Sequence, residues 1–216
     1  MGSSALIPPL LAQATGVVLD IGPGSGTQMP LFTNPALRKI YGAEPCVGLH
    51  TELRNKITSS GLGSTYQILT SGAESNQLIP ALKEARFSDE EIQKGIFDTI
   101  VCVRVLCSVS NPRETIRGLY DLLKPGGKLL VCEHVVNPWT TKKGSLAARF
   151  MQAVYALLGW SFWMGDCHMN RDTETTLRLV GDEAGTDQSG WESVDIERSF
   201  GWSPLSYISG TLVKKA

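Results

Sequence analysis

Residues 17–26 read VVLDIGPGSG, and this stretch decides the fold class. Three apolar residues indicate a buried strand, Asp20 stands at its end, and glycines follow at positions 22, 24 and 26. Glycine lets the backbone turn sharply and approach a ligand closely, and ligands of open α/β sheets bind at the carboxyl ends of the strands. The stretch therefore predicts a ligand site directly after the first strand.

The spacing of the three glycines narrows the kind of ligand. A dinucleotide fingerprint would place its third glycine at position 27, where this chain has threonine. No G-x-x-x-x-G-K-[ST] sequence occurs, so a P-loop is excluded. Taken alone, the glycines also fit a tight turn that binds no ligand.

Short apolar runs alternate with helical patterns along the rest of the chain, which is typical of a parallel sheet with crossover helices. Asn111, Pro112 and Glu114 indicate the start of one helix, and Ser88 with Glu91 indicates another, shorter helix in a segment that we predict to be an insertion, 75–95. Predicted strands cover residues 17–19, 45–49, 66–69, 97–106 and 128–133, and two more cover 191–199 and 207–213.

Composition describes one folded domain, residues 1–216, with 42% hydrophobic and 19% charged residues. Twenty Lys and Arg residues balance 21 Asp and Glu residues, so the charge pattern of a nucleic-acid binder is absent. The five cysteines form no C-x-x-C pair, and residues 1–13 carry no positive charge. We therefore expect free thiols in the cytoplasm. We expect no metal, because the only adjacent pair of ligands is Cys167 and His168.

The glycine stretch and the sequence after it resemble a known family. DIGPGSG is similar to motif I of class I S-adenosylmethionine-dependent methyltransferases, and residues 97–135 resemble the fourth strand, helix and fifth strand of that fold. Four further stretches resemble the small-molecule branch of this family, which includes ubiquinone/menaquinone-type and thiol methyltransferases. They are VRVLCSV, KPGG, EHV and GDCHMNRDT (165–173). The resemblance covers residues 14–214. It implies an α/β, Rossmann-like class I methyltransferase fold, a mostly parallel sheet with a C-terminal antiparallel hairpin.

The resemblance also implies the cofactor S-adenosylmethionine and the residues that hold it. The glycine turn would meet the methionyl part, and the residues after the second, third and fourth strands would meet the ribose, the adenine and the sulphonium. These residues are Asp20, Gly22, Pro23, Gly24, Gly26, His50, Thr51, Ala73, Glu74, Val103, Arg104 and Val105. Arg104 would pair with an acidic group of the cofactor or substrate, or with Glu133.

Two features depart from the family pattern. The family has an acidic residue at the end of its second strand, where we read His50, with Glu52 as the nearest acid. A neutral imidazole accepts only one hydrogen bond, so this position predicts altered cofactor binding and a gain in affinity for His50→Glu. The N-terminal cap, residues 1–15, is short, which leaves an open pocket, a trimmed chain or a lid from a second chain as explanations.

The acceptor side is expected to lie under a lid, residues 138–172. His134 and His168 are the candidate bases, although each also fits a structural role, and Trp160, Trp163 and Asn170 are candidate substrate contacts. Within the lid, residues 146–164 read as one helix whose apolar stripe would bury against the sheet. The alternative is a helix that lies on a membrane surface. The stripe consists of Leu146, Phe150, Val154 and Leu157.

These features predict methyl transfer from S-adenosylmethionine to a small apolar or aromatic acceptor, through oxygen or sulfur. The alternative is a protein of this fold that binds the cofactor but catalyses a non-methylating reaction such as a cyclisation. An intact DIGPGSG argues against a cofactor-free interaction module. The expected partner is a small-molecule acceptor and not a nucleic acid, while a peripheral membrane contact and a homodimer both stay open.

Overall fold

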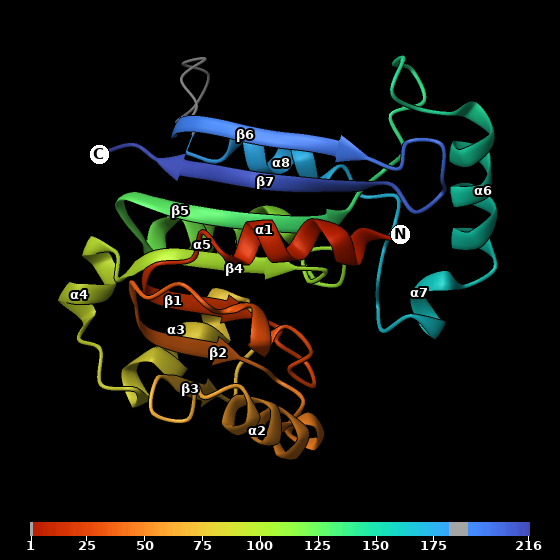
Figure 1. Cartoon of the computed structure of the whole chain (residues 1–216). Helices are drawn as coiled ribbons and strands as arrows, with labels where there is room; N and C mark the ends of the chain where they lie inside the picture. Colours follow the sequence, from red (N-terminus) through yellow and green to blue (C-terminus); the bar gives the residue numbers. More distant parts are fainter. Residues whose placement is uncertain (1, 182–189) are drawn as a thin grey trace.

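The computed structural model describes residues 2–181 and 190–216, and a seven-stranded sheet runs through it in the order β3-β2-β1-β4-β5-β7-β6. The first five strands are parallel, and β7 lies antiparallel between β5 and β6. This arrangement confirms the predicted fold class (Figure 1). The strands are β1 (Gly16–Ile21), β2 (Leu37–Ala43), β3 (Tyr66–Leu69), β4 (Phe97–Val103), β5 (Leu123–His134), β6 (Trp191–Ser199) and β7 (Tyr207–Lys214).

Helices cover both faces of the sheet, which is why its central strands are almost continuously apolar. Residues of α3, α5 and α8 pack on one face, and residues of α1 and α2 pack on the other. Figure 1 shows α1 crossing in front of β4 and β5. The helices are η1 (Ser3–Leu6), α1 (Ile7–Leu11), η2 (Met29–Leu31), η3 (Val47–Leu49), α2 (His50–Ser59), α3 (Ser75–Glu84), α4 (Asp89–Lys94), α5 (Pro112–Leu122), α6 (Leu146–Leu157), α7 (Trp160–Trp163) and α8 (Thr173–Leu179).

The two segments that we expected to be additions to the fold are parts of its layers. The segment 1–15 includes η1 and α1, and Ile7, Leu10 and Leu11 are buried on the sheet face. The segment 75–95 contains α3 and α4, which connect β3 to β4. Ser88 caps α4 with the reciprocal hydrogen bonds to Glu91 that the sequence predicts.

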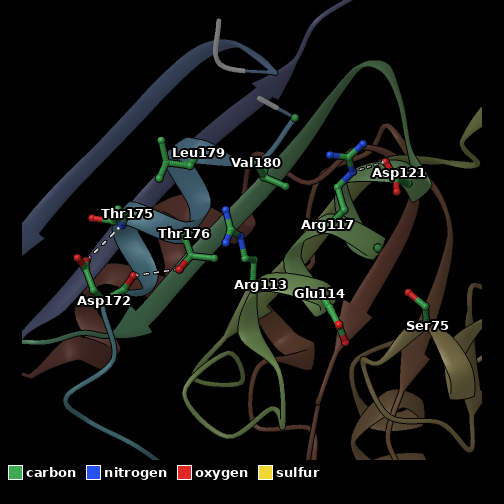
Figure 2. Close-up of a pocket in the computed structure, with 12 residues that line it drawn as sticks. Ser75, Arg113, Glu114, Arg117, Asp121, Asp172, Thr175, Thr176, Leu179 and Val180 are labelled. Carbon is green, nitrogen blue, oxygen red and sulfur yellow. Dashed lines mark hydrogen bonds and ion pairs between the residues drawn. The ribbon is translucent and has the colours of Figure 1, made fainter. Parts of the chain in front are cut away.

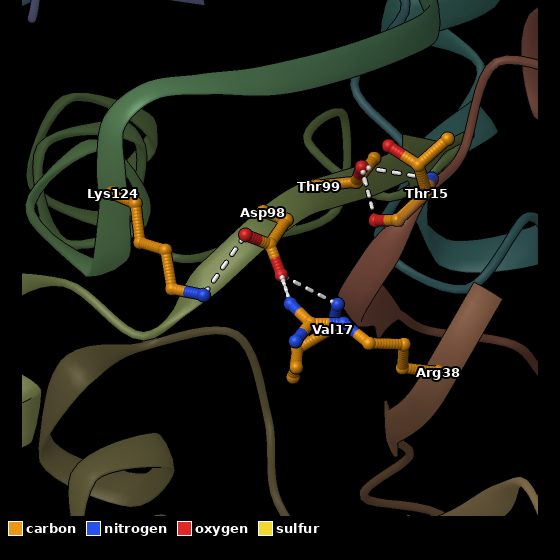
Figure 3. Close-up of polar contacts among 6 residues, drawn as sticks. All are labelled: Thr15, Val17, Arg38, Asp98, Thr99 and Lys124. Atoms are coloured by element: carbon orange, nitrogen blue, oxygen red, sulfur yellow. Dashed lines mark hydrogen bonds and ion pairs between the residues drawn. The ribbon is translucent and has the colours of Figure 1, made fainter. Parts of the chain in front are cut away.

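Asp98 and Thr99 join the amino ends of the strands (Figure 3). Asp98 Oδ2 accepts hydrogen bonds from Val17 N at 2.7 Å and from Arg38 at 2.7 Å, and Asp98 Oδ1 accepts one from Lys124 Nζ at 2.8 Å. These contacts link β4 to β1, β2 and β5. Burial alone would raise the pKa of Asp98, but the hydrogen bonds from Lys124, Val17 and Arg38 hold it below its usual value.

The predicted second strand was wrong. Residues 45–49 contain the short helix η3, and the strand is β2, eight residues earlier in the chain. The polar Arg38 and Lys39 concealed β2 in the sequence, since only its later residues are buried. Gly42 suits this position because a Cβ there would lie 2.1 Å from the Tyr66 hydroxyl of β3. Consequently Glu44, and not His50, follows the last residue of the second strand.

The predicted helix 146–164 was wrong in its length and in its buried face. It is interrupted at Gly159, whose φ of 81° is left-handed, and so it forms α6 and α7. Leu146, Phe150 and Leu157 are 68%, 67% and 87% exposed. Ala148 and Gln152 face the protein instead. Within the part of the chain that the structure describes, no helix combines the length and apolarity that crossing a bilayer requires.

Candidate functional site

The glycine turn after β1 has the conformation that its sequence predicts. Gly22, Gly24 and Gly26 have φ angles of 60°, 59° and 82°, which favour glycine. A Cβ on Gly22 would lie 2.7 Å from Val105 Cγ2, and one on Gly26 would lie 2.9 Å from Leu53 Cδ1. A Cβ on Gly24 would meet no atom within 4 Å. Two glycines therefore allow close packing within the protein, and Gly24 presents its backbone to open space.

Glu44 is the acidic residue at this edge of the sheet that the sequence analysis missed. Its side chain is buried, and its carboxylate accepts hydrogen bonds from Gly24 N at 2.8 Å and Cys46 N at 2.9 Å. His50 begins α2 and is buried, with its Nε2 2.9 Å from the carbonyl oxygen of Glu44. Thr51 is exposed on the same helix. The supposed departure from the family pattern is thus absent, because a carboxylate does follow the second strand.

Asp20 lies beneath the turn and is almost fully buried. Its Oδ2 accepts a hydrogen bond from the Tyr66 hydroxyl at 2.8 Å. Burial raises the pKa of Asp20 to about 7, the Tyr66 hydrogen bond opposes this rise, and the charge of Glu44 adds to it. Two carboxyl groups therefore sit at this end of β1 and β2: Glu44 holds the turn through Gly24 N, and Asp20 is bonded to Tyr66 of β3.

The residues after β3 and β4 complete this edge. Ala73 is buried, and Glu74 caps α3 and accepts a hydrogen bond from Ser110 N at 3.2 Å, which joins the two loops. A cavity of about 540 Å³ borders Glu74 and Ser110. Pro23 and Val103 are buried as well.

Arg104 does not form the expected pair with Glu133, and its pairing with an acidic group of the cofactor or substrate stays a prediction. Its φ of 60° ends β4 three residues before the predicted end, and its guanidinium donates to Ser3 Oγ at 2.7 Å. Glu133 accepts a hydrogen bond from Val105 N at 2.9 Å. Burial, and to a lesser extent the charge of Cys107, raises the pKa of Glu133 to about 8. Arg104 therefore ties the N-terminal segment to the end of β4.

Beyond β4 and β5 the structure brings together Cys107, His134 and Cys167. His134 Nδ1 lies 3.3 Å from Cys167 Sγ, and the ligand atoms of all three residues lie within 4.8 Å of one another. Hydrogen bonding with Cys107 is the largest influence on Cys167 and lowers its pKa to about 7, against the effect of burial. The same hydrogen bond and burial raise the pKa of Cys107 to about 12. This cluster was missed because its members are far apart in sequence.

The segment that carries Cys167 is held by one backbone N–H and one arginine side chain. His168 N donates to the Cys107 carbonyl at 2.9 Å, and Arg171 donates to the carbonyl oxygens of Leu106 and Val109 at 3.1 and 2.6 Å. Asn170 is exposed next to Arg171.

The helix α6 is anchored by one buried glutamine. Gln152 Nε2 donates to the carbonyl oxygens of Val135, Met169 and Pro204, and its Oε1 accepts from Asn137 N at 2.8 Å. These bonds place α6 and α7 beyond the carboxyl ends of the strands (Figure 1).

The two candidate tryptophans of α7 differ in their surroundings. Trp160 is half-buried and stacks on Tyr155 with ring centroids 5.8 Å apart, whereas Trp163 is 76% exposed.

A separate cavity of about 670 Å³ lies between α5 and α8, away from the glycine turn (Figure 2). Arg113, Glu114 and Arg117 line it from α5, and Thr175 and Thr176 line it from α8. We assign it no ligand, because Gly181 in its wall directly precedes residues 182–189, which lie outside the described part of the chain.

The strand order, the antiparallel pair at one edge and the glycine turn define a Rossmann-like class I methyltransferase fold. A family model described as a methyltransferase domain matches residues 4–187, so the chain belongs to the methyltransferase-domain family.

The comparisons with individual proteins agree with this assignment. The chain is similar to thiol S-methyltransferase TMT1B of Rattus norvegicus, with 29% identity over 126 residues, which are 58% of this chain and 47% of that protein. The chain therefore spans about half the length of such relatives.

Two solved structures show the same fold. The [4+2]-cyclase SpnF has a TM-score of 0.62 at 17% identity and covers 97% of this chain and 80% of its own. The N-methyltransferase NodS from Bradyrhizobium japonicum, in complex with S-adenosyl-l-homocysteine, has a TM-score of 0.61 at 14% identity and covers 99% and 86%.

Proposed function

We propose that this protein transfers the methyl group of S-adenosylmethionine to the sulfur of a small, apolar thiol. The observation that carries the cofactor half is Gly24, which faces open space in a left-handed conformation while Glu44 holds its N–H. The relationship to thiol S-methyltransferases supports sulfur over oxygen as the acceptor atom. When bound, the cofactor supplies a methyl group on a sulphonium, whose sulfur keeps the bonding electron pair.

The residues at the glycine turn fit such a cofactor. The backbone at Gly22, Gly24 and Gly26 would line its methionyl part, and Glu44 would accept hydrogen bonds from both ribose hydroxyls. Ala73 and Glu74 would flank the adenine. His50 would hold the backbone of Glu44 and not the ribose, because its Nε2 lies against that residue's carbonyl oxygen.

The protein's part in the reaction is to position the acceptor and exclude water, since the leaving group needs little assistance. His134 and Cys167 would border the acceptor side, and the backbone N–H of His168 and the guanidinium of Arg171 hold this wall. A non-methylating reaction was suggested by His50 in place of an acid after the second strand and by the short N-terminal cap. Glu44 removes the first of these grounds.

A matched series of acceptors tests this proposal. The protein is incubated with methyl-labelled S-adenosylmethionine and with benzenethiol, phenol or aniline, which differ only in the acceptor atom. We expect labelled methyl phenyl sulfide by mass spectrometry and at least tenfold less product from phenol or aniline. A preference for phenol or aniline would contradict the thiol assignment. No product, together with tight S-adenosylhomocysteine binding in calorimetry, would favour the non-methylating alternative.

We further propose that α6 and α7 rest on an anionic membrane surface, from which an apolar acceptor enters. Exposed apolar side chains gather on these helices, namely Leu146, Phe150, Leu157, Leu158, Phe162 and Trp163. Residues 138–165 include the exposed Lys142 and Lys143 and no acidic residue. An apolar helical surface flanked by cations is typical of helices that lie in the membrane interface.

Vesicle sedimentation tests this contact. We expect binding to phosphatidylserine-containing vesicles and at least fivefold weaker binding to phosphatidylcholine alone. The double variant Leu157→Glu/Phe162→Glu should lose binding, and Leu179→Glu, at a 53% exposed site on α8, should keep it. A dimer that the double variant abolishes, with no vesicle binding, would instead assign this surface to a second copy of the chain.

The cytoplasm remains our proposal for where the reaction occurs. All five cysteines are free, as expected in a reducing compartment.

A further inference from the structure

The fold brings together the side chains of three residues from separate segments of the chain, Cys107, His134 and Cys167. Cys107 lies in the loop after β4, His134 is the last residue of β5, and Cys167 follows α7. Their ligand atoms lie within 4.8 Å of one another. Cys107 and Cys167 are only 1% and 6% exposed, while His134 is partly accessible. Two sulfurs therefore form a buried wall, and an imidazole stands at its open side.

Contacts that do not involve the sulfur atoms hold this arrangement. The Cys107 carbonyl accepts from His168 N, and Val136 N donates to the Arg171 carbonyl at 2.9 Å, so the segment is pinned to both strands. The His134 ring lies against Tyr207, with centroids 4.3 Å apart. The three ligands are thus preorganised by the fold and are not linked by a disulfide.

The donor set and spacing suit one metal ion. Two thiolates and one imidazole are the ligands of catalytic zinc sites that keep a fourth position open. Tetrahedral zinc with ordinary bond lengths separates its sulfur and nitrogen ligands by about 3.5–3.8 Å. The 3.3 Å between His134 Nδ1 and Cys167 Sγ, and the 4.8 Å limit for the cluster, need only small side-chain movements to reach these values.

The position of the cluster connects it with the cofactor side. Gly22 packs so closely on Val105 that a Cβ would lie 2.7 Å from its side chain, and Cys107 is two residues further along that loop. His134 follows the buried Glu133, which holds the same loop through Val105 N. A metal on Cys107 and His134 would therefore lie on the loop that supports the glycine turn.

We infer that Cys107, His134 and Cys167 bind one zinc ion, whose fourth position takes the sulfur of the acceptor thiol. The second half of this inference rests on the proposed thiol methylation. No electron transfer occurs: Cys107, Cys167 and the acceptor each bind as thiolates, and their three protons pass to solvent. A metal-bound thiolate would be held on the loop that packs against Gly22, without a separate base.

Cobalt(II) is the first probe, because thiolate-to-cobalt charge transfer reports its ligands directly. The reduced, metal-stripped full chain should bind one equivalent and show the charge-transfer and visible bands of a tetrahedral two-thiolate site. Cys107→Ser, Cys167→Ser and His134→Ala should each weaken binding at least tenfold, while Cys46→Ser, at an exposed cysteine outside the cluster, should not. Unchanged cobalt binding in the three cluster variants, or no stoichiometric binding in the wild type, would overturn the site.

A second measurement does not depend on whether the variants fold. In the zinc-loaded wild type, iodoacetamide should label Cys46 and spare Cys167, and removal of zinc should increase Cys167 labelling at least tenfold. Equal labelling with and without zinc would overturn the site. So would oxidation of these two cysteines to a Cys107–Cys167 disulfide by air that is as fast in the zinc-loaded protein as in the zinc-free protein.

The fourth position is tested with benzenethiol and its methylated counterpart. Benzenethiol should shift the charge-transfer band of the cobalt protein, and methyl phenyl sulfide should not. Cobalt binding without such a shift would leave a metal site and exclude the thiol as its ligand. If the metal binds and the band shifts but no methyl transfer is detected, the proposed function fails and the site stands. If the protein transfers the methyl group but binds no metal, the metal site fails and the proposed function stands.

Discussion

Asp98 and Asp20 lie at opposite ends of the same sheet, and their pKa values are shifted in opposite directions. Asp98, at the amino ends of the strands, accepts hydrogen bonds from Val17 N, Arg38 and Lys124, and its pKa is lowered. Asp20, at the carboxyl ends, accepts a hydrogen bond from the Tyr66 hydroxyl, and its burial raises its pKa to about 7. Cationic side chains thus compensate the charge of Asp98, whereas burial disfavours the charged form of Asp20 below the glycine turn.

The two aspartates therefore affect stability in different pH ranges. The charged form of Asp98 is favoured in the fold, so its contribution is complete above the ordinary pKa of 3.8 and is lost as the pH falls through its lowered value. For Asp20 the neutral form is favoured, so the free energy of unfolding falls as the pH rises from 3.8 to about 7. Asp98 should thus lose its contribution to the free energy of unfolding in acid, and Asp20 should lower that free energy most above pH 7.

The largest expected effect comes from Gly24→Val. Valine fills the open space above the turn and strains a backbone with φ of 59°, so we expect affinity for S-adenosylhomocysteine to fall at least 100-fold in calorimetry. Gly61→Val is the matched control, since Gly61 has φ of 73° and also faces open space. It should show the same loss of stability, about 1–2 kcal/mol, with unchanged affinity. Equal affinities in the two variants would place the cofactor elsewhere.

Glu44→Gln should weaken S-adenosylhomocysteine binding by at least tenfold, because an amide cannot accept from two ribose hydroxyls as a carboxylate does. Glu52→Gln is its control, since Glu52 is exposed in the first turn of α2 and should have no effect. If Glu52→Gln has the larger effect, the ribose lies against α2. We also expect His50→Glu to destabilise the protein, in place of the gain in cofactor affinity that the sequence predicted, because it brings a buried carboxylate against the carbonyl oxygen of Glu44.

Asp98→Asn should lower the free energy of unfolding by about 1–2 kcal/mol at pH 7, since the exposed part of its ion pairs is screened by solvent. Urea denaturation at several pH values measures this. The difference from wild type should shrink below pH 3.8 as the wild-type carboxylate becomes protonated. A difference that stays constant with pH would show that the ion pairs contribute little and that the amide disturbs the fold by itself.

Asp20→Asn is the smallest effect and has the opposite sign. It removes the cost of a buried carboxylate but weakens the bond from Tyr66, so we expect stabilisation of about 1 kcal/mol at pH 8 and none at pH 4. The same denaturation series measures it. Destabilisation at pH 8 would mean that the charged form of Asp20 is required by the turn, and the contrast between the two ends of the sheet would disappear.

Elements with local signals could be predicted from the amino-acid sequence. The glycines at 22, 24 and 26, the buried strand before them and the caps at Ser88 and Asn111 all depend on backbone conformation or on hydrogen bonds within a few residues. Their positions were predicted almost without error, as was the antiparallel pair at the C-terminus. The resemblance of DIGPGSG to a methyltransferase motif was sound for the same reason, since the motif is a short, continuous turn.

Contacts between residues that are far apart in sequence depended on tertiary packing and could not be predicted. β2 was hidden by Arg38 and Lys39, and its register came from pairing with β1 and β3, which made Glu44 the acid beside Gly24. The apolar stripe on α6 was predicted to face the core. Helical periodicity shows that a helix has an apolar face but does not show which face the protein covers. The four hydrogen bonds of Gln152 turned the other face inward. Cys107, His134 and Cys167 likewise meet only because the chain crosses the ends of β4 and β5, a juxtaposition that no local pattern records.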